Sequence, residues 1–319
     1  MRNKRILLIG GSGFVGSALA NRLAAASCDI IIPTRRASRA GHLLLQPTVT
    51  LVEENIHEAS TLARLCTGAD AVINLTGILH SRSGTPYGPD FAHVHVELVQ
   101  KLVYACRTTQ VPRLIHISAL GAADQAPSEY LRSKAAGEAV ITGSSELAWT
   151  ILRPSAIFGR YDRFLNLFAE MSSLFPVLPL AGSQARFQPV YVEDVVEVIY
   201  RSLNTPDSAG QTFEVAGPTV YTLRQLFEYV SRLVGNPCPI IPLPDSLAML
   251  QAWLLEFAPQ PLISRDALRS MTVPNTATGT PLPFEIPPTP LEAVVPGWLG
   301  KNSRARYNPL RRYARRSQS

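Results

Sequence analysis

The sequence predicts an α/β fold in which helices cover both faces of a parallel sheet, with a smaller, interleaved α/β region toward the C-terminus. Short apolar runs alternate with helical patterns over the first 155 residues. This alternation is typical of parallel strands joined by helical crossovers. After Pro154 the alternation loosens and proline-rich stretches appear, which indicates a second, less regular region.

Strands are expected wherever a short apolar run stands between turn signals. These runs are Ile6–Ile9, Ile30–Ile32, Val49–Val52, Ala71–Leu75, Leu114–Ile117, Trp149–Leu152 and the stretch TFEVAG at 212–217. Helices are expected where apolar residues recur at helical spacing, over 95–107, 164–175, 193–203 and from the cap Thr222 to the stop Gly235.

We therefore expect a first domain over residues 1–155, completed by 190–217, and a second over 156–189 and 218–300. Residues 301–319 are expected to form a mobile basic tail, because they hold one Lys, six Arg and no acid. The whole chain has 30 basic and 24 acidic residues, so residues 1–300 carry 23 basic and 24 acidic ones. A body that is close to neutral argues against a nucleic-acid partner.

The segment 245–257, DSLAMLQAWLLEF, has apolar side chains around more than half of its circumference. It is too short to span a bilayer. The first expectation is a buried helix, and the alternatives are a subunit contact or a helix lying in a membrane surface. Together with the basic tail, this segment makes peripheral membrane contact a candidate partner interaction.

Other sequence features restrict the class of protein. No run of about 18 apolar residues exists, and the strand-like ILLIG follows MRNKR at once, so neither a transmembrane helix nor a targeting segment is expected. The four cysteines are scattered, which predicts reduced thiols. No metal site is expected, because no metal-ligand spacing of His, Cys or acidic residues occurs. The predicted location is cytoplasmic, with the inner face of a membrane as the alternative.

The most specific motif is ILLIGGSGFVGSALANRLA, in which Gly10, Gly13 and Gly16 join a strand to a helix. Glycines allow a tight turn and a close approach of the backbone to a pyrophosphate, and the helix N-terminus favours the negative charge. The motif predicts a Rossmann-type dinucleotide site. The second strand ends in IIIPTRR, where Thr34 replaces the usual ribose-binding acid and Arg35 and Arg36 follow. Guanidiniums suit a 2′-phosphate, so we predict NADP(H), with NAD(H) as the alternative.

Tyr130 and Lys134 in SEYLRSK form a candidate catalytic pair, because residues four apart share a helix face. With only four Lys and ten Tyr in the chain, chance predicts roughly 0.13 such pairs. A neighbouring cation lowers a tyrosine pKa by about 1–3 units.

These motifs, with INLTGIL, HISALG, YLRSKAAGE, LRPSAIFGRYDRFLN and FQPVYVEDV, resemble an extended short-chain dehydrogenase/reductase. The chain is most similar to the atypical, epimerase/dehydratase-like group that is named for the alpha-subcomplex subunit nine of mitochondrial complex I. The resemblance covers roughly residues 5–300. It implies that Tyr130 is the acid/base and that Lys134 lowers its pKa and binds the nicotinamide ribose. The residues expected to bind the cofactor are Gly10, Ser12, Gly13, Phe14, Val15, Gly16, Thr34, Arg35, Arg36, Asn55, Ile56, Leu75, Thr76, Gly77, Ser118, Tyr130, Lys134, Pro154 and Ile157.

The chain departs from the family pattern at two catalytic positions. Leu120 stands where the family has a catalytic hydroxyl, and His95 stands where it has an Asn. A histidine can form hydrogen bonds and titrate near neutral pH, so His95 could replace the Asn; the alternative, which is the more common case, is a tolerated polar residue. We expect cofactor binding to survive, with a structural, assembly or regulatory role in a respiratory-chain or quinone context. The alternatives are an active NADP-dependent reductase, dehydrogenase or epimerase, and a redox sensor that binds partners according to NADPH occupancy. Substrate and oligomeric state stay open.

Overall fold

The computed structural model describes residues 4–257, 263–280 and 282–300. The predicted basic tail lies outside the described residues. Two compact units are present. Of the described residues, the first unit comprises 4–154, 192–215, 277–280 and 282–286, and the second comprises 155–191, 216–257, 263–276 and 287–300.

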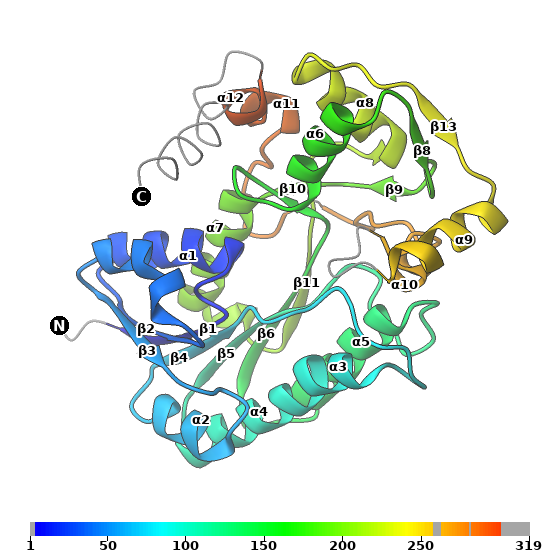
Figure 1. Ribbon diagram of the computed structural model, residues 1–319. Helices are drawn as coiled ribbons and strands as arrows, with labels where there is room; N and C mark the ends of the chain where they lie inside the picture. The colour runs from blue at the N-terminus through cyan, green and yellow to red at the C-terminus, as the bar shows by residue number, and fades with distance from the viewer. Residues whose placement is uncertain (1–3, 258–262, 281, 301–319) are drawn as a thin grey trace, which may run out of the picture. The chain divides into compact units, whose positions relative to one another are not determined.

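The first unit is built on a parallel sheet of seven strands in the order β11-β6-β5-β4-β1-β2-β3 (Figure 1). The sequence prediction of a doubly wound parallel sheet is therefore confirmed. Every strand pair in this sheet is parallel. The strands are β1 (Arg5–Ile9), β2 (Asp29–Thr34), β3 (Val49–Glu53), β4 (Ala71–Asn74), β5 (Arg113–Ile117), β6 (Ala148–Pro154) and β11 (Gln211–Val215).

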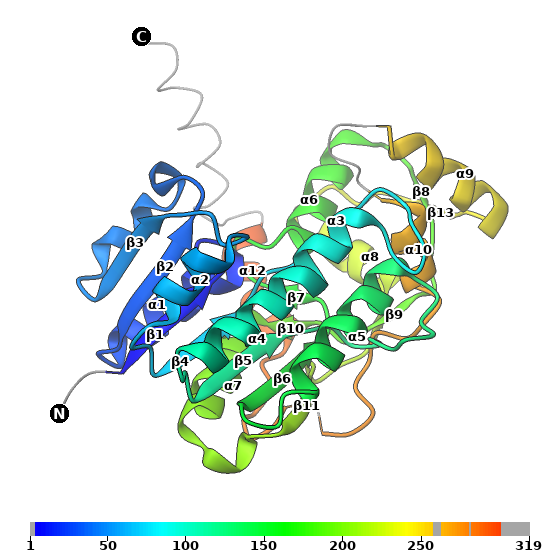
Figure 2. The same ribbon diagram turned by 90° about the horizontal axis from the view of Figure 1, so that it is seen from below.

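Helices cover both faces of this sheet. Helices α1 (Phe14–Ala25) and α7 (Val192–Asn204) pack together on one face. Figure 2 shows α2 (Ala59–Cys66), α4 (Leu98–Thr108) and α5 (Glu129–Thr142) side by side on the other. Short helices complete the unit: α3 (Pro89–Phe91), the π-helical η3 (Ala92–Glu97), η1 (Ala37–Arg39), η2 (Gly41–Leu45) and η4 (Pro206–Ser208).

Burial explains why the strands read as continuous apolar runs. In β1 and β4, nearly every side chain is buried, because helices lie on both sides of the central strands. Leu7, Ile9, Val72 and Leu114 share one core cluster with residues of α2 and α4. The carboxyl ends of parallel strands meet at one edge of a sheet, and ligands bind there in doubly wound folds.

The second unit has three two-stranded pairings around a smaller apolar core. Its strands are β7 (Ile157–Phe158), β8 (Leu178–Leu180), β9 (Arg186–Phe187), β10 (Val190–Tyr191), β12 (Tyr221–Thr222) and β13 (Ile240–Pro242). Its helices are α6 (Phe164–Leu174), α8 (Leu223–Leu233), α9 (Asp245–Leu255), α10 (Arg265–Ser270), α11 (Leu291–Val294) and α12 (Pro296–Leu299). The predicted start of α8 is confirmed, because Thr222 and Gln225 form a capping box.

The expectation that the 245–257 helix is buried is wrong. Only Ala248 and Ala252 of α9 are fully buried, Met249 and Leu255 are half-buried, and the other large apolar side chains are exposed. Across the described ranges, no helix is long and apolar enough to cross a membrane.

Candidate functional site

The glycine loop lies between β1 and α1, as predicted. Gly10 has φ +79°, a conformation that favours glycine. A Cβ on Gly16 would lie 2.5 Å from the Gly10 carbonyl oxygen. Ser12 and Gly13 are exposed at the tip of the loop, and Phe14 and Val15 are half-buried in the first turn of α1. The backbone is therefore folded tightly, as the approach of a pyrophosphate requires.

The loop after β4 lies directly beside the glycine loop. A Cβ on Gly10 would be 3.1 Å from the Leu75 carbonyl carbon and 3.3 Å from the Thr76 nitrogen. Asn74 shapes this loop, because its Oδ1 accepts hydrogen bonds from the Thr76 N–H (3.1 Å) and the Thr76 hydroxyl (2.6 Å). Its Nδ2 lies 3.1 Å from Nδ1 of the buried His116. Sequence reasoning missed Asn74, although an amide that ends an otherwise apolar strand was a usable signal.

Lys134 on α5 is buried and connects two strand ends. Its Nζ donates to the carbonyl oxygens of Ile117 at the end of β5 (3.0 Å) and Thr76 after β4 (3.5 Å). A Cβ on Gly77 would lie 3.4 Å from this Nζ. Burial lowers the pKa of Lys134 to about 8, although the nearby Glu138 carboxylate raises it. The ammonium is thus held at the strand edge where a dinucleotide would lie.

Ser118 follows directly after Ile117 and is also buried. Its N–H donates to the Leu152 carbonyl (2.7 Å), but its Oγ has no hydrogen-bond partner among the described residues. A buried hydroxyl without a partner is costly unless a ligand satisfies it. Ser118 follows Ile117, whose carbonyl accepts from Lys134, so its hydroxyl is placed to bond a polar ligand group such as a ribose hydroxyl.

Tyr130 lies one helical turn before Lys134, as the spacing predicts. It is half-buried, and its ring is 5.7 Å from the His95 ring and 6.0 Å from the Phe91 ring. Tyr130 also packs against Ala119, Ala126 and Leu131. The expected lowering of its pKa is wrong, because burial in these surroundings raises the pKa of Tyr130 to about 12. Its phenol therefore keeps its proton at neutral pH.

The expectation that His95 titrates near neutral pH is also wrong. Its Nε2 accepts a hydrogen bond from the Ile78 N–H (3.1 Å), so its Nδ1 carries the proton toward Ser133 Oγ (2.8 Å). The Ser133 hydroxyl in turn donates to the Tyr130 carbonyl (2.7 Å). Burial, followed by the charge of Lys134, lowers the pKa of His95 to about 2. His95 is therefore a neutral connector between the β4 loop and α5.

Leu120 is buried, and its N–H donates to the Pro154 carbonyl (3.1 Å). The side chain at this position therefore offers no hydroxyl to a substrate. Pro154 ends β6, and Ile157 begins β7 in the second unit.

The end of β2 exposes the two predicted phosphate-binding arginines. The hydroxyl oxygen of Thr34 accepts from the Arg36 N–H at 3.4 Å. Arg35 and Arg36 are exposed, and neither forms an ion pair with any residue that the structure describes. Glu53 pairs with Thr34 across the two strands, and its carboxylate accepts from the Ala37 N–H (3.1 Å). Sequence reasoning missed this acid beside the arginines.

The predicted residues after β3 form a turn. Asn55 uses its Oδ1 to accept from the His57 N–H (3.1 Å) and its Nδ2 to donate to Glu58 (3.1 Å). Ile56 packs against the core. The His57 ring stacks on His93 with 3.9 Å between centroids. Within the described ranges, the buried Nδ1 of His57 has no hydrogen-bond partner.

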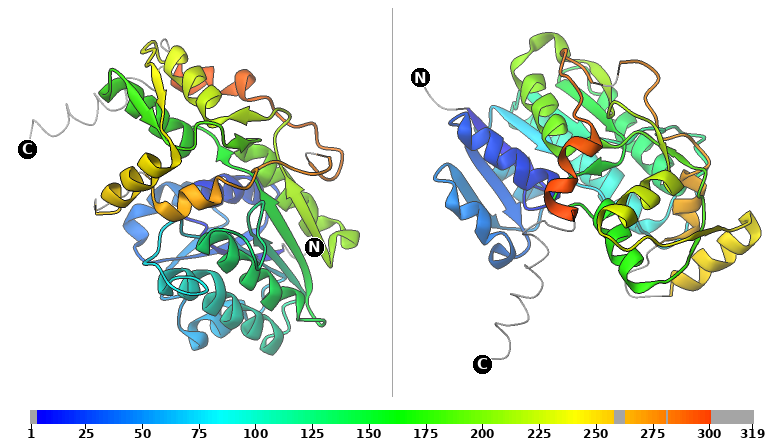
Figure 3. Two further views of the ribbon diagram at one scale, coloured as in Figure 1. Left: turned by 90° about the vertical axis from the view of Figure 1, so that its right-hand side faces the viewer. Right: turned by 90° about the horizontal axis from the view of Figure 1, so that it is seen from above.

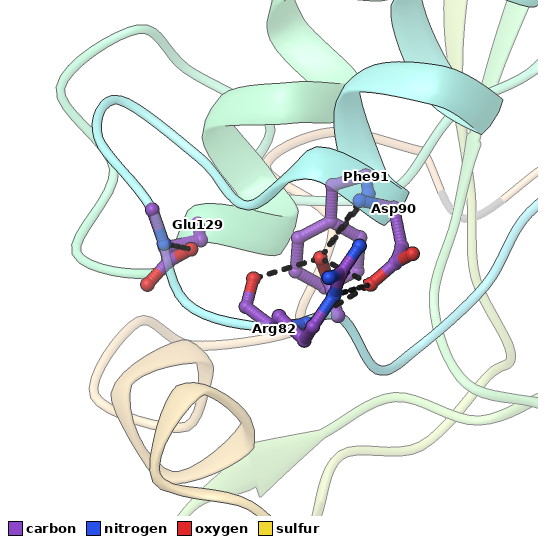
Figure 4. Close-up of polar contacts among 6 residues, drawn as sticks. Arg82, Asp90, Phe91 and Glu129 are labelled. Atoms are coloured by element: carbon purple, nitrogen blue, oxygen red, sulfur yellow. Dashed lines mark hydrogen bonds and ion pairs between the residues drawn. The ribbon is translucent and has the colours of Figure 1, made fainter.

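The loop over residues 81–90 is held by polar contacts and is attached to Glu129 at the start of α5 (Figure 4). Ser81 Oγ accepts from the Asp90 N–H (3.1 Å) and the Phe91 N–H (3.3 Å), and Asp90 Oδ2 accepts from the Arg82 N–H (3.1 Å). The Glu129 carboxylate accepts from the Gly84 N–H (3.0 Å).

Arg132 fastens the other side of this loop, because its Nε donates to the Pro86 carbonyl (2.8 Å). Glu129 and Arg132, which flank Tyr130 in the sequence, therefore anchor the loop to the first turn of α5. In the described part of the chain, no cluster of His, Cys, Asp or Glu could hold a metal ion.

Known proteins similar to this chain match most of its length. The model of the NAD dependent epimerase/dehydratase family matches residues 6–216. The mitochondrial NADH dehydrogenase (ubiquinone) 1 alpha subcomplex subunit 9 of Mus musculus is 32% identical over 296 residues, which is 89% of this chain and 77% of that protein. A ceramide reductase of Caulobacter vibrioides is 27% identical and matches 78% of each chain.

Solved structures share the fold. The dTDP-glucose 4,6-dehydratase DesIV of Streptomyces venezuelae, solved with NAD bound, has a TM-score of 0.65 and 22% identity. The match covers 75% of this chain and 84% of that one.

Proposed function

The chain belongs to the NAD dependent epimerase/dehydratase family, and on this premise we propose that it binds NADP(H) and serves a structural, assembly or regulatory role without ordinary turnover. The observation that carries the proposal is a contrast within one site: the residues that would bind the cofactor are present, whereas the catalytic positions are altered. Lys134 and the partnerless Ser118 hydroxyl stand ready for a ligand. Leu120 and the neutral His95 replace the groups that catalysis needs.

The residues of the first unit suit a dinucleotide along its whole length. The glycine loop would hold the pyrophosphate. Lys134 and Ser118 would hold the nicotinamide ribose, and the Thr76–Gly77 backbone would line the space between them. When bound, the nicotinamide would supply hydride chemistry. The protein supplies binding and orientation.

NADP(H) is favoured over NAD(H) by the two exposed guanidiniums after β2, since Arg matches the geometry of a phosphate. Glu53 beside them opposes this preference, because a carboxylate favours a ribose hydroxyl over a phosphate. The relevant test is isothermal titration with NADPH and NADH. We expect NADPH to bind more tightly, and we expect Ser118→Ala to weaken both cofactors alike. Tighter binding of NADH would overturn the assignment of Arg35 and Arg36.

The proposed respiratory or quinone context is supported by the similarity to the mouse protein, whose name describes a subunit of NADH dehydrogenase (ubiquinone). We accordingly propose a cytoplasmic location at the inner face of a membrane. Co-purification of the tagged chain with membrane fractions tests this location. Recovery only in the soluble fraction at low salt would refute it.

The second candidate function is an NADP-dependent reductase, dehydrogenase or epimerase in which Tyr130 transfers a proton. Two observations favour it: Tyr130 and Lys134 are both retained on one face of α5, and one relative is named a ceramide reductase. The raised pKa of Tyr130 opposes it, because a phenol with a pKa of about 12 is a poor acid at neutral pH. Turnover with a carbonyl or quinone substrate would establish this second function.

A further inference from the structure

Helix α9 in the second unit buries small apolar side chains and exposes large ones, whereas most helices of soluble proteins bury the large ones. Its buried residues are the small Ala248 and Ala252, which pack against Ala181 and Leu268. Its large apolar residues face solvent, with Phe257 just after the helix at 73% exposure and Leu254 at 57%. The other exposed members are Leu247, Leu250 and Trp253. Figure 3 shows α10 packed against α9, in orange and gold.

At 100° per residue, these five side chains lie within an arc of about 120° on the side opposite the two alanines. We call them the α9 stripe. Within α9, the only polar groups in this arc are the Ser246 hydroxyl and the Trp253 indole N–H. A helix of a soluble protein normally buries such a stripe, but none of the residues that the structure describes covers this one.

The second unit has further exposed apolar residues in and before the strands that α9 contacts. Gln251 donates to the Pro179 carbonyl (3.4 Å), which connects α9 to β8. Pro179 pairs with Ile241 of β13, and Ile241 is exposed. Leu174, Phe175 and Val177, which precede β8, are exposed as well.

We propose that the α9 stripe docks the protein on an anionic lipid bilayer, with α9 lying in the plane of the interface. The stripe carries no charge, and its aromatic residues are those that favour the interface between water and lipid. A specific protein partner would need hydrogen-bond complementarity, which this stripe barely offers. The acidic Glu256 next to the stripe is paired with Arg265 (2.9 Å), which reduces its repulsion of anionic lipid.

Charge in the sequence complements this surface. Residues 301–319 add seven positive charges and no negative ones. Each basic residue near an anionic surface adds about 1 kcal/mol of attraction. Apolar insertion and electrostatic attraction together are what a peripheral helix requires, because either alone binds weakly. The proposal depends on the second unit and the tail, and it does not depend on the dinucleotide site.

The test is vesicle flotation of the full-length chain. Vesicles of neutral phosphatidylcholine are compared with vesicles that also contain phosphatidylglycerol. We expect the wild type to float with the anionic vesicles, less so at high salt. The double variant Leu250→Ser/Leu254→Ser should bind about 30-fold more weakly, since two leucines no longer leave water.

The matched control is Leu44→Ser/Leu45→Ser in η2, because these leucines are at least as exposed as Leu250 and Leu254 but lie in the first unit. The control should float like the wild type. Both variants should keep the wild-type affinity for NADPH and the wild-type melting temperature, which shows that they are folded.

Two results would overturn the proposal: failure of the wild type to float with anionic vesicles, or equal flotation of the wild type and the stripe variant. Self-association of the wild type that the stripe variant loses, without flotation, would identify a second copy as the occupant and would also overturn it. If NADPH fails to bind while flotation behaves as predicted, the proposed function fails and this inference stands.

Discussion

Lys134→Met should stabilise the protein without cofactor while it weakens cofactor binding. Burial lowers the pKa of Lys134 from 10.5 to about 8. At 1.36 kcal/mol per unit, the buried charge costs about 3 kcal/mol at neutral pH. Loss of the hydrogen bonds to the Ile117 and Thr76 carbonyls offsets about 1–2 kcal/mol of this gain. At pH 7, the free energy of unfolding of the variant should therefore be about 1–2 kcal/mol higher than that of the wild type.

The pH dependence supplies a second measurement. Between pH 8 and 10.5 the unfolded chain binds a proton at this lysine that the folded chain has lost, so the stability contributed by this group rises with pH in that window. The cost of the charge is complete below pH 8 and fades toward pH 10.5. Urea unfolding at pH 7 and pH 9.5 should show the difference between variant and wild type shrinking at the higher pH.

Lys101→Met is the matched control, because Lys101 also donates to a backbone carbonyl, that of His57 (2.9 Å), but is only half-buried. It should not be stabilising. NADPH affinity of Lys134→Met should fall by about 10–100-fold with the loss of charge-assisted hydrogen bonds. A Lys134→Met variant that is less stable than wild type at pH 7, or one that binds NADPH normally, would refute the reasoning.

Three further predictions concern the same site. Gly16→Ala should abolish NADPH binding measured by titration, because the added Cβ would collide with the Gly10 carbonyl oxygen. The control Gly41→Ala should bind NADPH normally, because a Cβ at this position would have no atom within 4 Å. The His95 ring should stay neutral with its proton on Nδ1 from pH 5 to pH 8 by nitrogen-detected NMR, since its pKa is about 2, and a titration in that range would contradict the connector role. Arg35→Ala should lower NADPH affinity by about tenfold and leave NADH affinity unchanged; an equal loss for both cofactors would show that it does not contact a 2′-phosphate.

Local steric rules made the glycine loop and the sheet predictable. A strand that runs into closely spaced glycines leaves few backbone paths, and the structure shows the expected tight turn at Gly10. The placement of Tyr130 and Lys134 one helical turn apart followed from their spacing, because both lie on α5. These features depend on residues close together in the sequence.

The electrostatic state of the site was not predictable in the same way. The neutrality of His95 depends on its burial and on the charge of Lys134. Its tautomer depends on Ile78 and Ser133, which lie 17 and 38 residues away in the sequence. The raised pKa of Tyr130 likewise comes from burial that only the folded chain creates. Sequence spacing can bring a cation near a phenol, but it does not show how much water remains around it.

The orientation of α9 was mispredicted for a related reason. With apolar residues around most of the helix, the sequence does not show which face packs. The structure buries the alanine face, since two small side chains allow the helix to approach Ala181 and Leu268 closely. The apolar pattern of this segment therefore predicted that it forms a helix, but it did not predict which of its side chains are buried.

The central claim is that this site binds a nicotinamide dinucleotide but lacks a working proton-transfer group. The most direct measurement follows the fluorescence of NADPH bound to the wild type and to Tyr130→Phe while carbonyl and quinone substrates are added. The account predicts stable fluorescence with every substrate and equal affinity in both proteins. Substrate-dependent oxidation of NADPH by the wild type, lost in Tyr130→Phe with binding retained, would contradict it.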